Sequence, residues 1–372
     1  MTSKLIYDSS TNADLFYATK FFVLDPVIFV EKNGKKYLFL SDLELSRGKK
    51  EAEVHFVKPL KPFLDQVAKK NKHSNAASVV AMVVKSLGIR RLQVPHSTSF
   101  SLVDGLRKNG IQVEPGTAPF YEERTFKTPQ EKKYIETAQK NVFASIGWAE
   151  TILKQSKIRG NSLVWRGKIL TSEILRYEIS RFLLERGYMA QDTIVAGGTQ
   201  SVDPHGVGSG PLKPHQAIIV DVFPRCTKNG FHGDATRTFC KGRAPDVLKK
   251  QFFAVQQAQE MGLSEIRAGK NGKVIHGNIV RFFETTGFPV QVKNGNKEGF
   301  IHGTGHGIGL EIHEEPVRIT NRDFILKAGH VVTVEPGLYY QPLGGVRLED
   351  IVFVTKNGCE VLARYPKKLE IS

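Results

Sequence analysis

Four acidic residues lie in two segments whose patterns predict hairpins that bring the acids together in pairs. In the first segment, an apolar strand over residues 217–223 carries Asp221, and a returning strand follows Asp234. Paired residues are symmetric about the turn of a hairpin, so a turn centred just before Asn229 and Gly230 would place these two aspartates opposite each other. Facing carboxylates repel unless a positive charge lies between them. The segment therefore predicts a cation between its two strands.

The second segment repeats this arrangement with glutamates. Glu335 ends an apolar strand, Glu349 lies in the returning segment, and the point of symmetry between them is Pro342. Each glutamate lies among apolar strand residues, where a lone charge would be costly to bury. A cation shared by the two acidic pairs is the simplest explanation.

Between these hairpins, residues 300–313 contain three histidines, His302, His306 and His313, among four glycines. Glycine at this density lets the backbone approach a ligand closely. One neutral imidazole together with four carboxylates, two of which can bridge, suits a pair of Mn, Co, Fe or Zn ions rather than a closed structural zinc site. The spacing alone identifies no particular metal.

Other interpretations of these histidines must be weighed. A single histidine is more often a core or surface group than a ligand, and by its local sequence alone His205 belongs to that class. His306 together with the four acids favours a metal site instead, whereas spacing leaves His302 and His313 undecided. The Gly-His-Gly sequence around His306 resembles half of a phosphate loop, but neither a Lys-Ser/Thr pair nor a strand–turn–helix pattern accompanies it.

From Leu5 to about Pro115 the sequence alternates short β-branched and aromatic runs with helical stretches, which predicts an α/β domain. A hairpin is expected from residues 21–30 to residues 36–40, with Asn33 and Gly34 in its turn. Helices are expected over residues 75–87, ended by Gly88, and over residues 101–108. Strands are expected over residues 91–95 and 111–115.

The pattern changes near residues 124–133, where Thr128-Pro129 precedes a charged run that opens a long amphipathic helix. Within residues 125–372 the expected helices cover residues 130–155, 171–186 and 246–266. The expected strands cover residues 217–223, 236–240, 331–335 and 346–354. This order predicts an α+β domain with helices packed on a largely antiparallel sheet.

The chain of 372 residues, with 40% hydrophobic and 24% charged residues, has the size and composition of a globular protein of two domains. Its most apolar N-terminal stretch, residues 21–30, is too short and too interrupted for a membrane span. The first residues lack the order of a secretory signal. We therefore expect a cytoplasmic protein without a membrane partner.

The cysteine pattern and the charge distribution argue against several further classes of protein. The three cysteines are far apart in the sequence and contain no Cys-x-x-Cys pair, so neither a disulfide framework nor a zinc ribbon is indicated. The net charge of +16 is spread over both halves of the chain rather than concentrated. This distribution favours a solvated surface over a nucleic-acid groove, and no nucleic-acid partner is expected.

With these motifs in place, the sequence resembles the pita-bread metallopeptidases, which include Xaa-Pro aminopeptidases, Xaa-Pro dipeptidases (prolidases), methionine aminopeptidases and the non-metal creatinases. The resemblance covers nearly the whole chain. Residues 1–124 look like the creatinase-type N-terminal domain, and residues 125–372 look like the metallopeptidase catalytic domain. The implied fold is an α/β N-terminal domain plus an α+β catalytic domain of pita-bread (creatinase/aminopeptidase) architecture.

The resemblance also implies a role for each residue that matches a family motif. The five metal ligands of the family fall on Asp221, Asp234, His306, Glu335 and Glu349. Its active-site histidines and the arginine of its Arg-x-Glu-Asp motif fall on His205, His302, His313 and Arg347. The implied cofactor is two divalent metal ions, Mn, Co, Zn or Fe.

This chain departs from the family pattern at the first ligand. The family usually has Asp-x-Gly there, whereas this chain has Phe223 in place of the glycine, and its hairpin is two residues longer. Both aspartates are retained. We therefore expect the departure to alter substrate preference rather than metal binding.

The implied mechanism is metal-assisted hydrolysis. Two ions bridged by Asp234 and Glu349 would hold a water and supply hydroxide near neutral pH. Glu335 would carry the proton of that water to the leaving nitrogen. The histidines at 302 and 313 would donate to the oxyanion or position the substrate, and His205 would line the leaving-group side.

The implied function is hydrolysis of Xaa-Pro bonds, at the N-terminus of peptides or in dipeptides, by a homodimer, since family members with this N-terminal domain usually act on such bonds and often pair. Two alternatives remain open. A creatinase-like hydrolase shares both domains but lacks the ligand set, and a non-catalytic pita-bread binding protein typically loses ligands. The choice between aminopeptidase and strict dipeptidase depends on how loops cap the cleft, which the sequence does not reveal.

Overall fold

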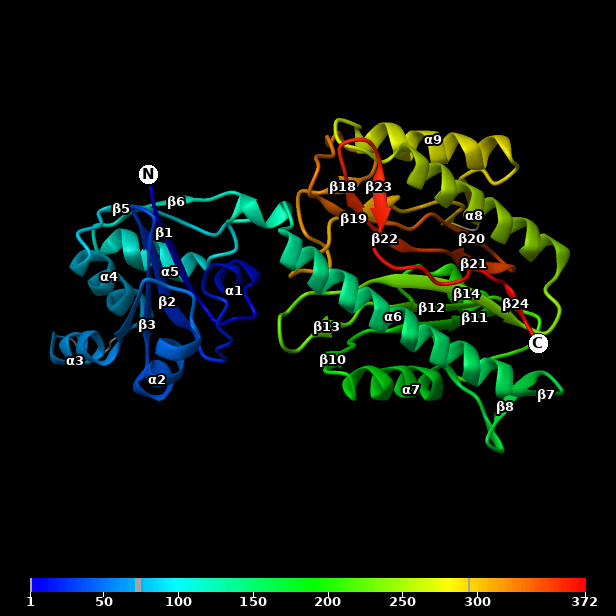
Figure 1. Ribbon diagram of the computed structural model, residues 1–372, viewed down its shortest axis with the longest axis horizontal. Helices are drawn as coiled ribbons and strands as arrows, with labels where there is room; N and C mark the ends of the chain where they lie inside the picture. The colour runs from blue at the N-terminus through cyan, green and yellow to red at the C-terminus, as the bar shows by residue number, and fades with distance from the viewer. Residues whose placement is uncertain (1, 71–74, 294) are drawn as a thin grey trace. The chain divides into compact units, whose positions relative to one another are not determined.

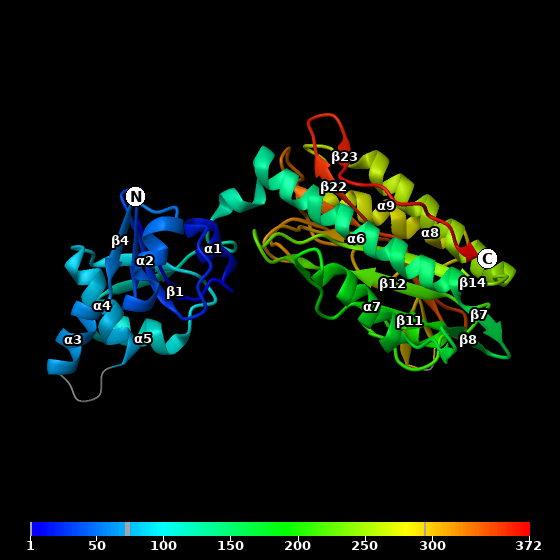
Figure 2. The ribbon, with the colours of Figure 1, turned by 60° about the horizontal axis from the view of Figure 1, so that its bottom comes forward.

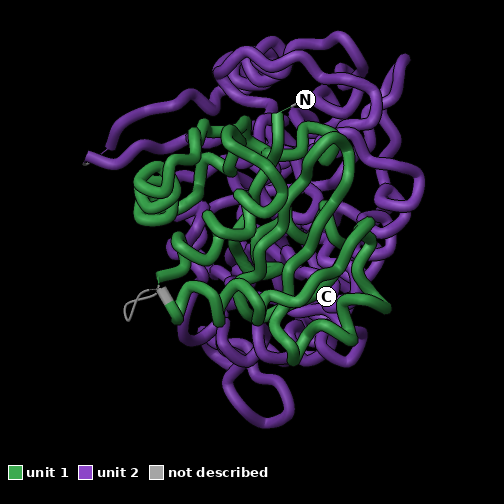
Figure 3. Tube along the Cα trace, turned by 90° about the vertical axis from the view of Figure 1, so that its left-hand side faces the viewer, with its two compact units in different colours: residues 1–124 green, residues 125–372 purple. Residues whose placement is uncertain are grey.

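The computed structural model describes residues 2–70, 75–293 and 295–372. The chain separates into two compact units, residues 1–124 and residues 125–372, which Figure 3 draws in different colours. Unit 1 contains the strands β1 (Ser3–Asp8), β2 (Val27–Lys32), β3 (Lys35–Leu40), β4 (Phe56–Pro59), β5 (Arg91–Val94) and β6 (Gln112–Pro115). Its helices are α1 (Ala13–Thr19), α2 (Asp42–Glu51), α3 (Lys61–Lys70), α4 (Ala76–Ser86) and α5 (Phe100–Lys108), and a 3₁₀ turn, η1 (Glu122–Thr125), follows.

These strands form one mixed six-stranded sheet in the order β4-β3-β2-β1-β5-β6. The pairs β1–β2 and β2–β3 are antiparallel, and the remaining pairs are parallel. One face packs against α3, α4 and α5, and the other face packs against α1 and α2. Unit 1 is therefore an α/β unit with a core on each face of its sheet.

The predicted hairpin in unit 1 is confirmed, with one difference in length. Asn33 and Gly34 form its turn with φ angles of 51° and 74°. The first strand begins only at Val27, whereas the sequence pattern predicted residue 21. Before it, the backbone of Val23 pairs with Ser10, and Pro26 has no amide hydrogen to donate to a strand.

Unit 2 contains four long helices, α6 (Pro129–Gln155), α7 (Ser172–Leu184), α8 (Asp246–Glu265) and α9 (Gly272–Thr285). Figures 1 and 2 show α6 close to α7 and α8 close to α9. The predicted start of α6 is confirmed by a capping box, in which the Thr128 hydroxyl and the Glu131 carboxylate each accept an amide hydrogen bond. The sequence reading missed α9, whose two glycines and β-branched residues weaken its helical pattern. Among the described residues, no helix combines the length and the apolar character needed to cross a membrane.

The strands of unit 2 form two principal antiparallel groups. The first group is the sheet β11-β12-β14-β24, with β11 (Ile194–Gly197), β12 (Ile218–Val222), β14 (Ala235–Lys241) and β24 (Glu370–Ile371), of which only the β14–β24 pair is parallel. The second comprises β19 (Val331–Val334), β22 (Asp350–Val354), β23 (Cys359–Val361), β20 (Gly337–Tyr340) and β21 (Gly344–Arg347). Helices α6 and α7 share a core with the first group, and α8 and α9 share a core with the second. This is the predicted α+β arrangement.

Short elements complete unit 2. They are β7 (Lys157–Arg159), β8 (Ser162–Trp165), β9 (Lys168–Ile169), β10 (Tyr188–Met189), η2 (Gly198–Val202), β13 (Arg225–Cys226), β15 (Gln291–Lys293), β16 (Asn296–Glu298), β17 (Gly305–His306) and β18 (Arg318–Ile319). They pair as β7-β8-β9, β10-β13, β15-β16 and β17-β18.

The register of the glutamate hairpin agrees with its predicted symmetry. Strand β19 pairs Val334 with Asp350, and β20 pairs Gly337 with Arg347. Both pairings place the point of symmetry at Pro342, so Glu335 and Glu349 lie opposite each other.

The register of the aspartate hairpin differs from the prediction by two residues. Asp221 pairs with Thr236 rather than with Asp234, because the turn covers residues 227–230 and the Cys226 amide donates to the Phe231 carbonyl. A shift of two residues keeps side chains on the same face of a sheet. The two aspartates therefore still share a face, but they lie diagonally.

Arg237 on β14 connects the two strand groups. Its side chain is 1% exposed and donates to the carbonyl oxygen of Glu349 at 2.7 Å and to Asp350 Oδ1 at 2.7 Å. The same guanidinium also donates to the carbonyl of Tyr365 at 3.0 Å. This one side chain therefore joins the aspartate strands to the segment that carries Glu349.

Replacing Arg237 by methionine should lower the free energy of unfolding by ~3 kcal/mol, because it leaves a buried carboxylate with one charged partner fewer. We expect the lower end of the usual range, since Lys367 still lies 3.0 Å from Asp350 Oδ2. Urea unfolding of the full chain measures the effect, with Arg181→Met, which removes two partly exposed ion pairs, as the matched control. Equal unfolding midpoints for the two variants would show that Arg237 does not hold the strand groups together.

Candidate metal centre

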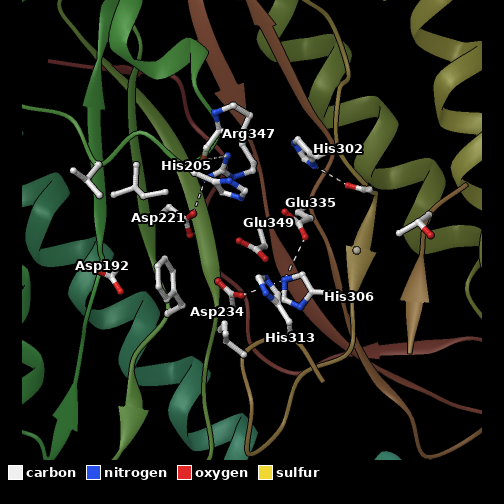
Figure 4. A pocket seen from close by; sticks show the side chains of 18 residues that line it. Asp192, His205, Asp221, Asp234, His302, His306, His313, Glu335, Arg347 and Glu349 are labelled. Atoms are coloured by element: carbon white, nitrogen blue, oxygen red, sulfur yellow. Dashed lines mark hydrogen bonds and ion pairs between the residues drawn. The ribbon is translucent and has the colours of Figure 1, made fainter. Parts of the chain in front are cut away.

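One pocket of about 560 Å³ in unit 2 gathers all nine residues for which the sequence predicted a catalytic or metal-binding role. Figure 4 shows the four acidic side chains at residues 221, 234, 335 and 349 directed toward one another, with His306 and His313 beside them. Asp221 lies on β12, and Asp234 directly precedes β14. Glu335 directly follows β19, and Glu349 lies between β21 and β22. The lining residues among the predicted set are Asp221, Asp234, His306, Glu335, Glu349, His205, His302, His313 and Arg347.

Short distances define the centre of this pocket. His306 Nε2 lies 3.3 Å from Glu335 Oε1 and 3.6 Å from Asp234 Oδ2. One ligand atom each from Asp234, His306 and Glu349 lie within 4.8 Å of one another. Such an arrangement of two carboxylates and an imidazole matches the donor set of a divalent transition metal.

The electrostatics of the pocket also fit bound cations. Burial, followed by repulsion from Asp221 and Glu335, raises the pKa of Asp234 well above its usual value. Burial, followed by repulsion from Asp234, raises the pKa of Glu349 in the same way, and burial raises the pKa of Glu335 to about 7. A group of carboxylates with raised pKa values is stabilised in its ionised form when a cation lies among them. This charge surplus supports a metal site.

Two further observations agree with that fit. The Oδ1 atom of Asp221 is buried and has no hydrogen-bond partner among the described residues, so it can accept a cation without breaking a contact. Burial lowers the pKa of His306, which keeps its imidazole neutral and able to coordinate a metal. Among the described residues that line the pocket, Arg347 is the only arginine or lysine.

Arg347 connects the acids to His302 through a tyrosine. Its Nη2 atom lies 2.5 Å from Asp221 Oδ2, and its Nη1 atom donates to the Tyr339 hydroxyl at 2.7 Å. The Tyr339 hydroxyl lies 2.9 Å from His302 Nε2, and His302 Nδ1 lies 2.7 Å from the carbonyl oxygen of Gly303. Burial lowers the pKa of His302 to about 3, so the ring is neutral, donates from Nδ1 and accepts the tyrosine proton at Nε2.

Tyr339 is a site residue that the sequence analysis missed. It is fully buried, and it pairs across β20 and β21 with Gly345. A side chain at position 345 would place its Cβ 2.7 Å from the Tyr339 ring. The Gly-Gly pair opposite this ring was the available signal, because it leaves the space that the ring fills.

Buried glutamines from the outer helices hold the acid-bearing segments. Gln139 of α6 donates to the Asp234 carbonyl at 2.8 Å and accepts from the Asp234 amide at 2.9 Å. Gln259 of α8 donates to the carbonyls of Val334 and Leu348, at 2.9 and 3.1 Å, which directly precede the two glutamates. Helix α6 thus fixes the backbone at Asp234, and helix α8 fixes the backbone beside Glu335 and Glu349.

At Gly305 the glycine-rich segment lies very close to the backbone of β19; the predicted approach to a ligand stays a prediction. A Cβ at this position would lie 1.9 Å from the carbonyl oxygen of Thr333, a distance that no side chain tolerates. The next amide, that of His306, donates to Thr333 Oγ1 at 3.1 Å, and the same hydroxyl donates to Glu335 Oε1 at 3.1 Å. Glycine therefore lets Thr333 orient both His306 and Glu335.

The remaining predicted residues lie around this centre. The rings of His306 and His313 meet edge to face with centroids 4.4 Å apart, and burial lowers the pKa of His313. His205 lies on the exposed loop after η2, where its amide donates to Asp203 Oδ1 at 3.0 Å. Phe223 lines the pocket, opposite Asp234 by the register of the hairpin.

The chain is similar to known peptidases in sequence and in structure. An uncharacterized peptidase from Bacillus subtilis (strain 168) is 30% identical over 303 residues, which cover 80% of this chain and 78% of that protein. An Xaa-Pro dipeptidase from Pyrococcus furiosus is 35% identical over 182 residues, 48% of this chain and 49% of that protein. The solved structure of an Xaa-Pro dipeptidase from Bacillus anthracis superposes with a TM-score of 0.82 at 26% identity, covering 100% of this chain and 95% of that chain.

The full-length superposition confirms the predicted fold class, an N-terminal α/β part followed by a catalytic part of prolidase type. The family profile described as "Metallopeptidase family M24" matches residues 164–356, which include the segments that carry all nine predicted site residues. The likeness to the Bacillus subtilis peptidase extends over most of both chains. The chain therefore belongs to metallopeptidase family M24.

Proposed function

We propose that this chain is a dinuclear-metal-dependent peptidase that hydrolyses Xaa-Pro bonds, either at the N-terminus of peptides or in dipeptides. The observation that carries the proposal is the cluster of four carboxylates around His306 in one pocket, whose negative charge exceeds what Arg347 compensates. The specificity for proline is supported by the Xaa-Pro dipeptidase from Pyrococcus furiosus, to which half of this chain is 35% identical.

The proposed metal ligands are Asp221, Asp234, His306, Glu335 and Glu349. Divalent ions of Mn, Co, Zn or Fe bound there would polarise a water molecule and lower its pKa, which makes it a nucleophile near neutral pH. The unpartnered Asp221 Oδ1 atom and the neutral ring of His306 are the features that suit this role best.

The other side chains have distinct proposed tasks. Glu335 takes the proton of the attacking water and passes it to the prolyl nitrogen, which leaves poorly unless it is protonated. His313 donates to the developing oxyanion. His302 has both ring nitrogens engaged, so it positions Tyr339 and through it Arg347.

The proposal also gives roles to His205 and to the two units of the chain. His205, on the exposed loop at the pocket rim, lines the side of the leaving group. Residues 1–124 form the creatinase-type N-terminal domain, which limits substrate size or contributes to a homodimer, and residues 125–372 form the metallopeptidase catalytic domain. Retention of the complete acidic donor set is what favours a peptidase over a creatinase-like hydrolase or a non-catalytic binding protein.

Purified protein supplied with Mn or Co should bind up to two divalent ions per chain and hydrolyse Xaa-Pro dipeptides or tripeptides, but not their Xaa-Ala counterparts. Chelation should abolish hydrolysis, because the carboxylates need a cation at neutral pH. Elemental analysis measures the metal, and a rise in thermal midpoint with added metal provides a second readout. Hydrolysis that persists without metal would favour the creatinase-like alternative, and metal binding without hydrolysis would favour the binding protein.

Glu349→Gln should lose bound metal together with activity, whereas His205→Ala should keep the metal and lose ~3 kcal/mol of transition-state stabilisation, about a hundredfold in rate. The reason is that Glu349 is a buried member of the acidic cluster, while His205 lies at the exposed rim. Glutamine keeps the volume of the side chain, so folding is preserved. Full metal occupancy and activity in Glu349→Gln would refute the ligand assignment.

Phe223→Gly should change which Xaa residue is preferred more than it changes metal affinity. Phe223 is a wall of the pocket beside Asp234 but offers no ligand atom. Removing a ring from such a wall alters the relative kcat/KM of large and small Xaa-Pro substrates by about tenfold. If the ranking across a panel of such substrates stays unchanged while the metal content also stays constant, Phe223 has no part in selectivity.

A further inference from the structure

A second hollow adjoins the pocket that contains the proposed metal ligands. This groove, of about 750 Å³, shares Pro204 and Val207 with the pocket, and these two residues flank His205 in the sequence. One wall is the loop over residues 199–209, and the other comprises the β15–β16 hairpin with Ile301 and Gln341. The groove is as large as a typical ligand site. It therefore continues the pocket on the side to which the proposed function assigns the leaving group.

The loop wall of the groove is held in one conformation. The Gln200 side chain donates to the Ser209 carbonyl at 3.0 Å and accepts from the Ser209 amide at 2.7 Å. Asp203 Oδ1 accepts from the His205 amide at 3.0 Å, and the Pro204 carbonyl accepts from Arg347 Nη1 at 3.2 Å. The same loop thus shapes both hollows, which makes them parts of one continuous surface.

The opposite wall is anchored by a buried acid. Glu298 is 2% exposed, and its two oxygens accept from the Gln341 amide at 3.0 Å and from Gln291 Nε2 at 2.9 Å. Lys293 pairs with Asn296 across the hairpin, on the same face as Glu298. Lys293 is exposed, and no ion pair joins it to another described residue. Its ammonium acts electrostatically on the buried carboxylate of Glu298, and its exposed position also leaves it accessible to an anionic ligand.

The lining suits the main chain of a peptide. It combines apolar residues, among them Val202 and Ile301, with amide and hydroxyl side chains that offer both donors and acceptors, at Thr199, Gln200, Ser209, Asn296 and Gln341. The two acids in the lining, at positions 203 and 298, already accept backbone or side-chain hydrogens. A site specific for dipeptides binds nothing beyond the proline that leaves, so a dipeptide would not occupy this groove.

We propose that this groove binds the residues that follow proline in a longer peptide, with Lys293 as the counter-charge for a carboxylate. The inference rests on the proposed function and deepens it, because it makes peptides longer than dipeptides the preferred substrates. The carboxylate comes either from the C-terminus of a short peptide or from an acidic side chain. Both present the same chemistry to an ammonium group.

The test compares kcat/KM of the metal-loaded full chain for an Xaa-Pro dipeptide with values for tripeptides and tetrapeptides of the same Xaa. We expect the longer peptides to be better substrates. We also expect a free C-terminal acid to exceed its amide, or a terminal Glu to exceed Gln within the amide series, by about threefold, as for an exposed ion pair. Whichever series shows this preference identifies the source of the carboxylate.

Lys293→Gln should reduce the ratio of kcat/KM between the acidic peptide and its uncharged counterpart to one, while leaving hydrolysis of the dipeptide unchanged. Lys168→Gln, which changes an exposed lysine on another short hairpin outside both hollows, should keep the preference for the acidic peptide. No gain with length, or a carboxylate preference that survives in Lys293→Gln, would overturn the groove assignment while dipeptide hydrolysis still supports the proposed function. Failure to hydrolyse any Xaa-Pro peptide would instead overturn the proposed function itself.

Discussion

Repulsion among four clustered carboxylates, of which three are buried and that of Glu335 is partly exposed, is the interaction that the surrounding structure of unit 2 must oppose. Burial and mutual repulsion raise the pKa values of Asp234, Glu335 and Glu349, so the protein alone stabilises their ionised forms poorly. Holding such groups together requires a rigid backbone on every side. A cation bound among them would turn the same repulsion into a source of affinity.

The rigidity comes from buried polar side chains that act on the backbone rather than on the acids. Gln139 and Gln259 reach inward from α6 and α8 to the segments beside the acids. Arg237 joins the strand groups at the carbonyl of Glu349. Because these bonds use main-chain groups, they leave the carboxylate oxygens to the pocket and to a few side-chain partners, namely Arg347, Thr333 and Thr236. The scaffold therefore positions the acids without neutralising them.

Around this centre, the pocket differs in character from one side to another. Arg347, Tyr339 and His302 form a hydrogen-bonded chain that ends at Asp221. On another side, the ring of Phe223 takes the place of the glycine that is usual in the resembling family. Past His205 the wall opens into a groove lined by both polar and apolar residues. In the proposed function, positioning, side-chain selection and accommodation of longer peptides would thus fall to separate parts of the pocket and its adjoining groove.

The sequence by itself determined the types of residue in the site and much of the local structure that carries them. Paired acids at hairpin spacing and a glycine-rich histidine segment were enough to assemble the candidate donor set. The symmetric spacing about Pro342 also gave the correct register for the glutamate hairpin, because its strands pair on both sides of the same turn.

Only the tertiary structure decided the rest. The aspartate hairpin is shifted by two residues because its turn closes through the Cys226 and Phe231 backbone groups, a choice that the sequence symmetry does not reveal. Gln139 and Gln259 act through partners far away in the chain, so no local pattern marks them. The Gly-Gly pair opposite Tyr339 marks the space for its ring, but its contact with His302 arises only in the folded chain. The groove beside His205 likewise exists only where the loop over residues 199–209 meets the β15–β16 hairpin. Local spacing encodes contacts between near neighbours, whereas contacts between distant segments arise from the packing of helices and strands.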